Sequence, residues 1–172
     1  MSGRKNKAIE YCAYGLLLLV IFILQSSRGT AVTVWGFRMD LIPFFVTALA
    51  LFKGPYAAGG FGFAAGLLCA SNSPILDGLY ATYYGLLGAA CGVFALRYMR
   101  RVLPSAMLLG LGASMLKGVI AYLFYYGLVY QAPIGRMALL VLGDTVLSAI
   151  PSVLIFFAIR AIDLRFMEKD ET

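Results

Sequence analysis

The chain has 172 residues, of which 62% are hydrophobic and 13% are charged, and its formal net charge is +6. A soluble domain usually has about a quarter of its residues charged, so this composition excludes an ordinary soluble protein. The basic residues flank apolar blocks, which argues against nucleic-acid binding, and the absence of histidine removes the commonest metal ligand and general base.

The apolar residues form long blocks that are typical of helices surrounded by lipid. We predict an all-α polytopic membrane protein, a bundle of about six transmembrane helices that forms one domain over residues 1–172. The first block has no small-x-small cleavage site after it, so we predict a retained helix and not a signal peptide. The expected spans, in chain order, are 8–25, 40–52, 56–70, 78–96, 105–130 and 137–159.

A mixed loop with a β-rich piece, AVTVWGF, separates the first two spans, and its aromatic side chains suit the headgroup zone. The second span, 40–52, is short, because a membrane helix needs roughly 20 residues. It would tilt little, recruit part of the preceding segment, or lie where the protein thins the bilayer. Pro43 lies in its first turn, where proline costs least, and Lys53-Gly54-Pro55 predicts a tight turn after it.

Six helices place both termini on the same side of the membrane. With the N-terminus inside, ten basic residues lie in inner segments and three lie in outer loops. This bias predicts that both termini are cytoplasmic. The inner residues are Arg4, Lys5, Lys7, Lys53, Arg97, Arg100, Arg101, Arg160, Arg165 and Lys169, and the outer ones are Arg28, Arg38 and Arg136.

Small residues recur four apart on three successive predicted helices. In lipid, such stripes allow the close backbone contact that holds helices together. They would serve either the internal packing of the bundle or the docking of a partner's transmembrane helix, and the sequence leaves both explanations open. The residues are Ala58, Gly62 and Gly66, then Ala81, Gly85, Gly88 and Gly92, and then Gly110, Ser114 and Gly118.

Two opposite charges fall inside predicted spans: Lys117 in 105–130 and Asp144 in 137–159. An isolated charge in the bilayer costs at least about 2.5–3.5 kcal/mol, so each one needs a partner or water. We predict that they form a charge pair that fixes helix register, with a proton relay or a substrate site as the alternative. Asp40 and Asp77 stand at helix starts, where each would cap the helix or contact a partner.

The three cysteines, Cys12, Cys69 and Cys91, lie far apart inside apolar blocks. We interpret them as small packing residues, and we expect no metal or other cofactor. An intramembrane protease is disfavoured as well, because the HExxH and GxGD motifs and paired aspartates are absent.

The segment from Met39 to Arg101 combines five features in a fixed order. It has an acid that opens an apolar helix, a basic-glycine-proline turn, a helix with G-x-x-x-G-L-L, a G-L-Y-A helix start and a basic end. This pattern resembles the bacterial rod shape-determining protein MreD family over about a third of the chain, and the remainder is similar by hydropathy and length. The five features are Asp40, Lys53-Gly54-Pro55, Gly62 to Leu68, Gly78 to Ala81, and Arg97 to Arg101.

The resemblance implies a non-enzymatic subunit of the machinery that builds the side wall of rod-shaped bacteria, in the cytoplasmic membrane. The implied partners are MreC, a periplasmic protein anchored by one helix, a RodA-type glycosyltransferase, a class B penicillin-binding transpeptidase, and MreB filaments. The family's fold is similar to that of the substrate-binding subunits of energy-coupling-factor transporters.

That similarity raises the alternative function, a vitamin- or metabolite-binding membrane subunit of such a transporter. A substrate binder needs polar and aromatic groups that converge on an outward cavity. The sequence offers these candidates: Arg38, Asp40, Asn72, Asp77, Gln131, Arg136, Tyr80, Tyr83, Tyr84, Tyr125 and Tyr126.

Overall fold

The computed structural model describes residues 2–26, 33–34, 37–71, 78–123 and 134–170. In this part of the chain there are five helices and one pair of two-residue antiparallel strands, in which Thr33 pairs with Arg38. The strands overlap the β-rich piece of the first loop and end one residue beyond it, at Arg38. The elements are α1 (Ser2–Ser26), β1 (Thr33–Val34), β2 (Phe37–Arg38), α2 (Ile42–Ala70), α3 (Leu79–Tyr98), α4 (Leu103–Ala121) and α5 (Ile134–Asp170).

Each of the five described helices is long and apolar enough, by length and composition, to cross a membrane. The chain is therefore a helical bundle with the character of a multi-pass membrane protein. The expected count was six, and the difference has one cause in the described residues: the expected spans 40–52 and 56–70 both belong to α2.

A kink at Gly54 divides α2 into two arms. Gly54 has φ 79° and ψ −172°, a left-handed conformation that only glycine adopts without strain. Pro55 follows at once, and its missing N–H does not matter directly after a break in the helix. The predicted turn at Lys53-Gly54-Pro55 is therefore this kink, which separates a central arm (residues 42–53) from a hairpin arm (residues 55–70).

The central arm is the core of the bundle, since every residue from 42 to 52 is buried. It has no charged residue before Lys53, and its length is only about 18 Å at 1.5 Å per residue. The side chains of the neighbouring helices surround it; for example, the ring of Phe52 lies 5.4 Å from the ring of Phe156 of α5. Its one hydroxyl is satisfied locally, because Thr47 donates to the carbonyl of Pro43 at 2.9 Å.

The hairpin arm packs antiparallel against α3 with the two backbones in close contact. A Cβ atom added at Gly62 would collide with the carbonyl group of Tyr84, and one at Gly66 would collide with the backbone of Ala81. This close approach explains why glycine recurs along both helices, since no side chain fits between them.

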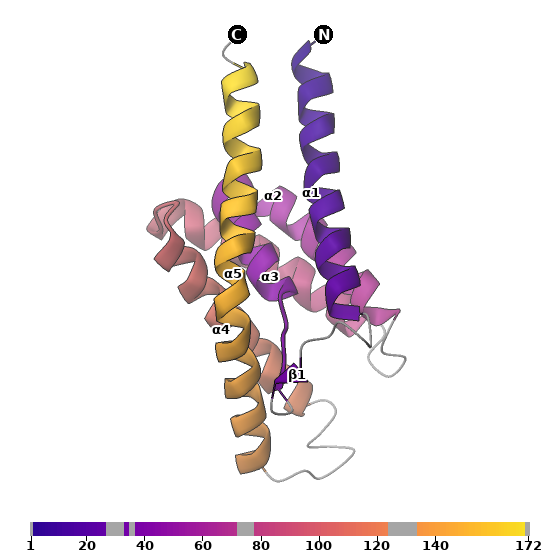
Figure 1. Cartoon of the computed structure of the whole chain (residues 1–172), viewed down its shortest axis with the longest axis vertical. Coiled ribbons are helices and arrows are strands. Elements are labelled where there is room, and N and C mark those ends of the chain that lie inside the picture. Colours follow the sequence, from indigo (N-terminus) through magenta and orange to yellow (C-terminus); the bar gives the residue numbers. More distant parts are fainter. Residues whose placement is uncertain (1, 27–32, 35–36, 72–77, 124–133, 171–172) are drawn as a thin grey trace.

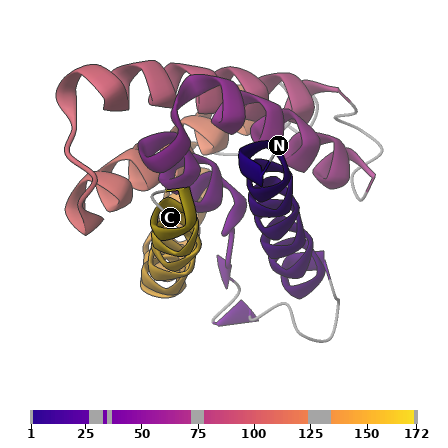
Figure 2. The ribbon, with the colours of Figure 1, turned by 90° about the horizontal axis from the view of Figure 1, so that it is seen from above.

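Figure 1 shows both chain termini at the same end of the molecule. Helices α1 and α5 run along the long axis of the bundle. Figure 2, the view down that axis, shows that the hairpin of α2 and α3 crosses the molecule at an angle to them.

Candidate functional site

The buried charges gather at the two ends of the central arm. The proximal cluster, at the end nearer the chain termini, consists of Lys53, Glu10 of α1 and Asp163 of α5. The ammonium group of Lys53 pairs with Glu10 and lies 2.8 Å from Oδ1 of Asp163. The carboxylate side chains are only 9% and 6% exposed, and Tyr14 donates to Glu10 at 3.4 Å. One lysine thus holds the first and the last helix against the central arm.

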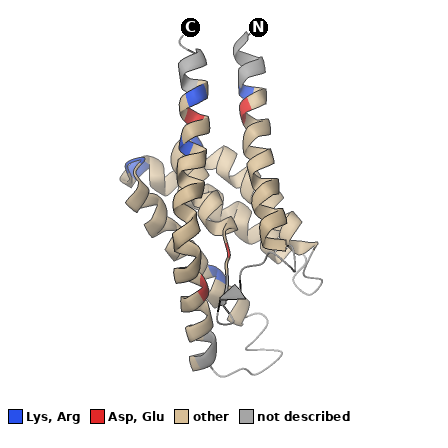
Figure 3. Ribbon diagram, viewed as in Figure 1, with Lys and Arg blue, Asp and Glu red and all other residues tan. Residues whose placement is uncertain are grey.

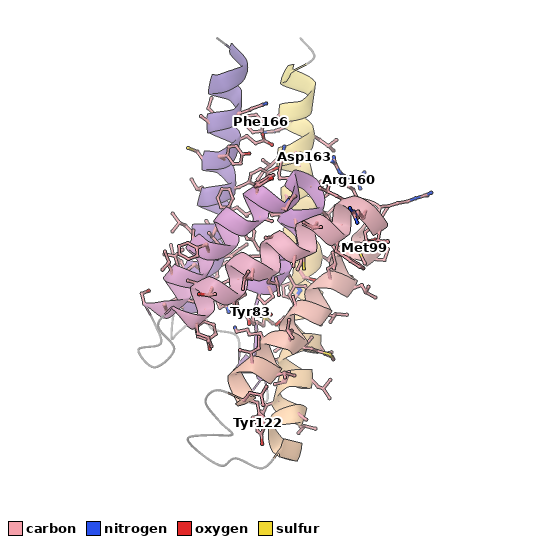
Figure 4. The ribbon with its side chains drawn as sticks, turned by 180° about the vertical axis from the view of Figure 1, so that it is seen from behind. Tyr83, Met99, Tyr122, Arg160, Asp163 and Phe166 are labelled. Carbon is pink, nitrogen blue, oxygen red and sulfur yellow. The ribbon has the colours of Figure 1, made fainter. Side chains whose placement is uncertain are left out.

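Figure 4 shows Asp163 on the part of α5 that extends toward the termini, well away from Tyr122 at the opposite end. This cluster was not predicted from the sequence, where Glu10 lies near the start of the first expected span, Lys53 in the predicted turn, and Asp163 beyond the last expected span. The sequence did contain one indication of the cluster. All three residues lie at the same expected membrane boundary, and the lysine and the two acids belong to different helices.

The distal cluster, at the other end of the central arm, consists of Asp40, Lys117 of α4, Gln25 of α1 and Ser148 of α5. The Asp40 carboxylate pairs with Lys117 and accepts a hydrogen bond from Nε2 of Gln25 at 2.8 Å. The backbone N–H of Asp40 donates to Oγ of Ser148 at 2.7 Å. Asp40 therefore connects three helices at the start of the central arm.

Helix α3 joins the distal cluster through two aromatic rings. The Lys117 ammonium group lies 5.4 Å from the ring centroid of Tyr80 and 5.6 Å from that of Tyr84. Both distances suit cation–π attraction. Tyr84 is fully buried, and its hydroxyl has no hydrogen-bond partner among the described residues.

The expected partner of Lys117 was Asp144, and the structure pairs Lys117 with Asp40 instead. The reason is the rotation of α4. Ser114 contacts Thr145 of α5 at 3.1 Å, and Gly118 faces Val141 of α5, so these positions define the face of α4 toward α5. Lys117 precedes Gly118 and is turned from that face by about 100°.

The two helix-start acids have different outcomes. Asp40 was expected to cap the second helix or to contact a partner, but the N-cap of α2 is Leu41, and no side chain caps it. The Asp40 carboxylate is used by Lys117 and Gln25 instead. Asp77 lies outside the described residues.

All ten predicted small-residue positions face other parts of the same chain, so they serve internal packing. Gly88 and Gly92 of α3 contact the backbone of Ala58 and Pro55, and Gly110 of α4 faces the ring of Phe44. The remaining positions lie in the same contacts between α2 and α3 or between α4 and α5; they are Gly62, Gly66, Ala81, Gly85, Ser114 and Gly118.

Of the residues suggested for a substrate site, the structure describes four side chains, and three of these come together. Asp40, Tyr80 and Tyr84 meet at Lys117, whereas Tyr83 uses its hydroxyl to donate to the Ala113 carbonyl at 2.5 Å. The structure does not describe Asn72, Asp77, Tyr125, Tyr126 and Gln131, or the side chains of Arg38 and Arg136.

An open groove of about 400 Å³ lies between α1 and the hairpin arm. Small residues of the hairpin arm form its floor at helical spacing, and two exposed tyrosines border it. A Cβ atom added at Gly60 would meet no atom within 4 Å, so this position has free space in front of it. The lining residues are Tyr11, Tyr56, Ala57, Gly60, Phe61 and Ala64.

The described residues contain no group of three or more His, Cys, Asp and Glu side chains that could hold a metal ion. The arrangement of charges fixes four helices around the central arm. In comparisons with known proteins, no family model, no curated protein and no solved structure matches this chain.

Proposed function

We propose that this protein is a non-enzymatic membrane scaffold or regulator of the bacterial cell-wall elongation machinery. It lies in the cytoplasmic membrane with both termini in the cytoplasm. Its proposed partners are MreC, a RodA-type glycosyltransferase and a class B penicillin-binding transpeptidase, and through them MreB filaments. The proposal rests on the sequence pattern from Met39 to Arg101, which resembles the MreD family.

The structural observation that supports this proposal is the use of the buried charges. Lys53 and Lys117 both form ion pairs with acids of the same bundle, at the two ends of one helical arm. Charges that neutralise each other between helices position those helices, whereas a solute-binding site needs polar groups that point into a cavity. A rigid bundle with apolar outer faces suits association with other membrane helices.

The groove between α1 and the hairpin arm is the described surface that best suits the single helix of a partner such as MreC. Ala57, Gly60 and Ala64 would let the partner's backbone come close, as the internal glycines do between α2 and α3. Leucine at Gly60 would occupy the groove, and its first atom causes no collision, because no atom lies within 4 Å of the new Cβ. The variant Gly60→Leu therefore separates partner binding from folding.

The experiment is to purify the tagged protein from its own membrane and identify the proteins that come with it. We expect a single-span protein with a coiled coil, and at least a fivefold lower yield of it with Gly60→Leu. The matched control is Gly112→Leu on α4, where a new Cβ also meets no atom within 4 Å; it should leave the yield unchanged. Absence of such a protein from the purified wild type would contradict the proposal.

The second candidate function, a transporter subunit that binds a vitamin or metabolite, is favoured by one observation. Near Lys117, two buried polar atoms, the hydroxyl of Tyr84 and Oε1 of Gln25, have no hydrogen-bond partner among the described residues. A polar solute could satisfy both. Co-purification of a small molecule, or of a coupling subunit with ATPases, would support transport over the scaffold.

A further inference from the structure

The connection between α3 and α4 carries three arginines within five residues. Arg97 lies in the last turn of α3, and Arg100 and Arg101 follow in the short connection to α4. All three side chains are exposed. Backbone hydrogen bonds from Met99 to Ala95, at 3.1 Å, and from Val102 to the carbonyl of Arg100, at 2.8 Å, fix the connection. We call these three residues the arginine turn.

The arginine turn has no acid to neutralise it in the described part of the chain. The three described salt bridges all use a lysine as the cation, and none uses an arginine. The acids at this end of the bundle whose side chains the structure describes, Glu10 and Asp163, are both paired with Lys53. The positive charge of the turn is therefore free to attract an anion from outside the chain.

More positive charge lies at the same end of the molecule. Figure 3 shows basic residues at the connection between α3 and α4 and on α5 toward the C-terminus. In Figure 4, Arg160 of α5 and Met99 of the connection lie on the same side of the bundle. Arg160 adds a fourth exposed arginine to this side of the molecule. Clusters of about four or more basic residues at the cytoplasmic end of membrane helices attract anionic lipids.

Exposed apolar side chains adjoin the arginine turn. Leu96 and Tyr98 are 66% and 71% exposed, and the ring of Phe94 lies 5.1 Å from that of Tyr98. A soluble acidic protein would contact the arginines and leave this apolar surface uncovered. A phospholipid matches both the arginines and the apolar surface. Its phosphate can accept hydrogen bonds from the planar guanidinium groups, and its acyl chains can pack against the apolar side chains of α3.

We propose that the arginine turn binds the headgroup of an anionic phospholipid, with the lipid's acyl chains against the exposed face of α3 at Phe94 and Tyr98. This inference is independent of the proposed scaffold function, since it concerns the surface of the protein toward lipid and not its partners.

The test measures lipid binding to the delipidated full-length protein in a nonionic detergent, by native mass spectrometry. The protein is titrated with phosphatidylglycerol and, separately, with phosphatidylcholine. The variant R100Q/R101Q removes two charges from the turn, and the matched control K7Q/R165Q removes two exposed charges from α1 and α5. Because all four side chains are exposed, both variants should keep the helical content and elution volume of the wild type.

A basic residue near an anionic surface contributes about a fivefold change in binding, so R100Q/R101Q should lower the preference for phosphatidylglycerol by roughly 25-fold. The control should lower it less than about threefold, since its charges are outside the turn. An R100K/R101K variant keeps the charge and should keep most of the preference.

Three outcomes would overturn the inference. The wild type could show no preference for phosphatidylglycerol, or the control could lose as much binding as R100Q/R101Q, which would mean diffuse attraction. Inorganic phosphate or a poly-glutamate peptide could also compete as well as the lipid, which would assign the turn to a free anion or to an acidic protein.

Discussion

The ion pair between Asp40 and Lys117 should couple α2 to α4 energetically, and a double-mutant cycle measures that coupling. Asp40→Asn keeps an oxygen that accepts from Gln25 but removes the negative charge, and Lys117→Met keeps most of the side-chain volume but removes the positive one. Each single change leaves a buried charge without its partner, which costs about 3–5 kcal/mol in a buried site.

Partial exposure of the two side chains places the expected loss of stability at the lower end of the range of about 3–5 kcal/mol. The side chains of Lys117 and Asp40 are 22% and 14% exposed, so solvent screens part of the interaction. We expect a loss of about 3 kcal/mol in the free energy of unfolding for Asp40→Asn. Lys117→Met should cost about 1 kcal/mol more, because it also loses cation–π contact with Tyr80 and Tyr84.

The double variant should be more stable than the sum of the single losses predicts, by a coupling energy of about 2 kcal/mol. The assay is reversible unfolding of the purified protein in mixed micelles with increasing denaturing detergent, followed by circular dichroism. Asp144→Asn serves as the control, and its effect should add to that of Lys117→Met. Additive losses for Asp40→Asn and Lys117→Met, or coupling of Lys117 to Asp144 instead, would refute the assigned pair.

Three further substitutions test the packing and the kink by the same unfolding assay. Gly66→Leu should lower the free energy of unfolding by at least about 3 kcal/mol, because its Cβ collides with the backbone of α3. Gly60→Leu should lower it by less than about 1 kcal/mol. Equal losses for the two variants would contradict the packing of α2 on α3. Lys53→Met should cost about 3–5 kcal/mol by leaving two buried carboxylates unpaired, and adding Glu10→Gln should restore part of it; no recovery would argue against the proximal cluster. Gly54→Ala should cost about 1–2 kcal/mol, since alanine is strained at φ 79°, and a neutral result would contradict the kink.

Hydropathy alone predicted the helical bundle well. The expected span 78–96 corresponds to α3 at Leu79–Tyr98, and the expected spans 8–25 and 137–159 lie within the longer helices α1 and α5. The helices extend past the expected ends because charged residues continue a helix outside the apolar layer. The span 105–130 was expected to reach beyond the described end of α4 at Ala121.

The kink in α2 shows where local sequence was sufficient and where it was not. A glycine followed by proline predicted a break in the helix at the correct residues. Whether such a break separates two independent spans or bends one element depends on the packing of both arms, which involves α1, α3, α4 and α5. Those contacts are between distant parts of the chain, so a local pattern cannot reveal them.

The sequence predicted that the buried lysine pairs with an acid, but not which acid. An intramembrane lysine needs an acid, and the sequence indicated Lys117 correctly as a residue with such a need. The choice between Asp40 and Asp144 depended on which face of α4 turns toward α5. Small residues occur on more than one face of α4, so the rotation of that helix could not be read from the sequence.

The central arm also has a consequence for how the protein is made. At about 18 Å, the arm is too short to cross the roughly 30 Å hydrocarbon layer by itself when it leaves the ribosome. Two of its anchors, Ser148 and Asp163, lie on α5, which is synthesised after the arm. We therefore expect stable insertion of the arm to require α5, and a nascent chain that stops before α5 should be degraded by membrane quality-control proteases.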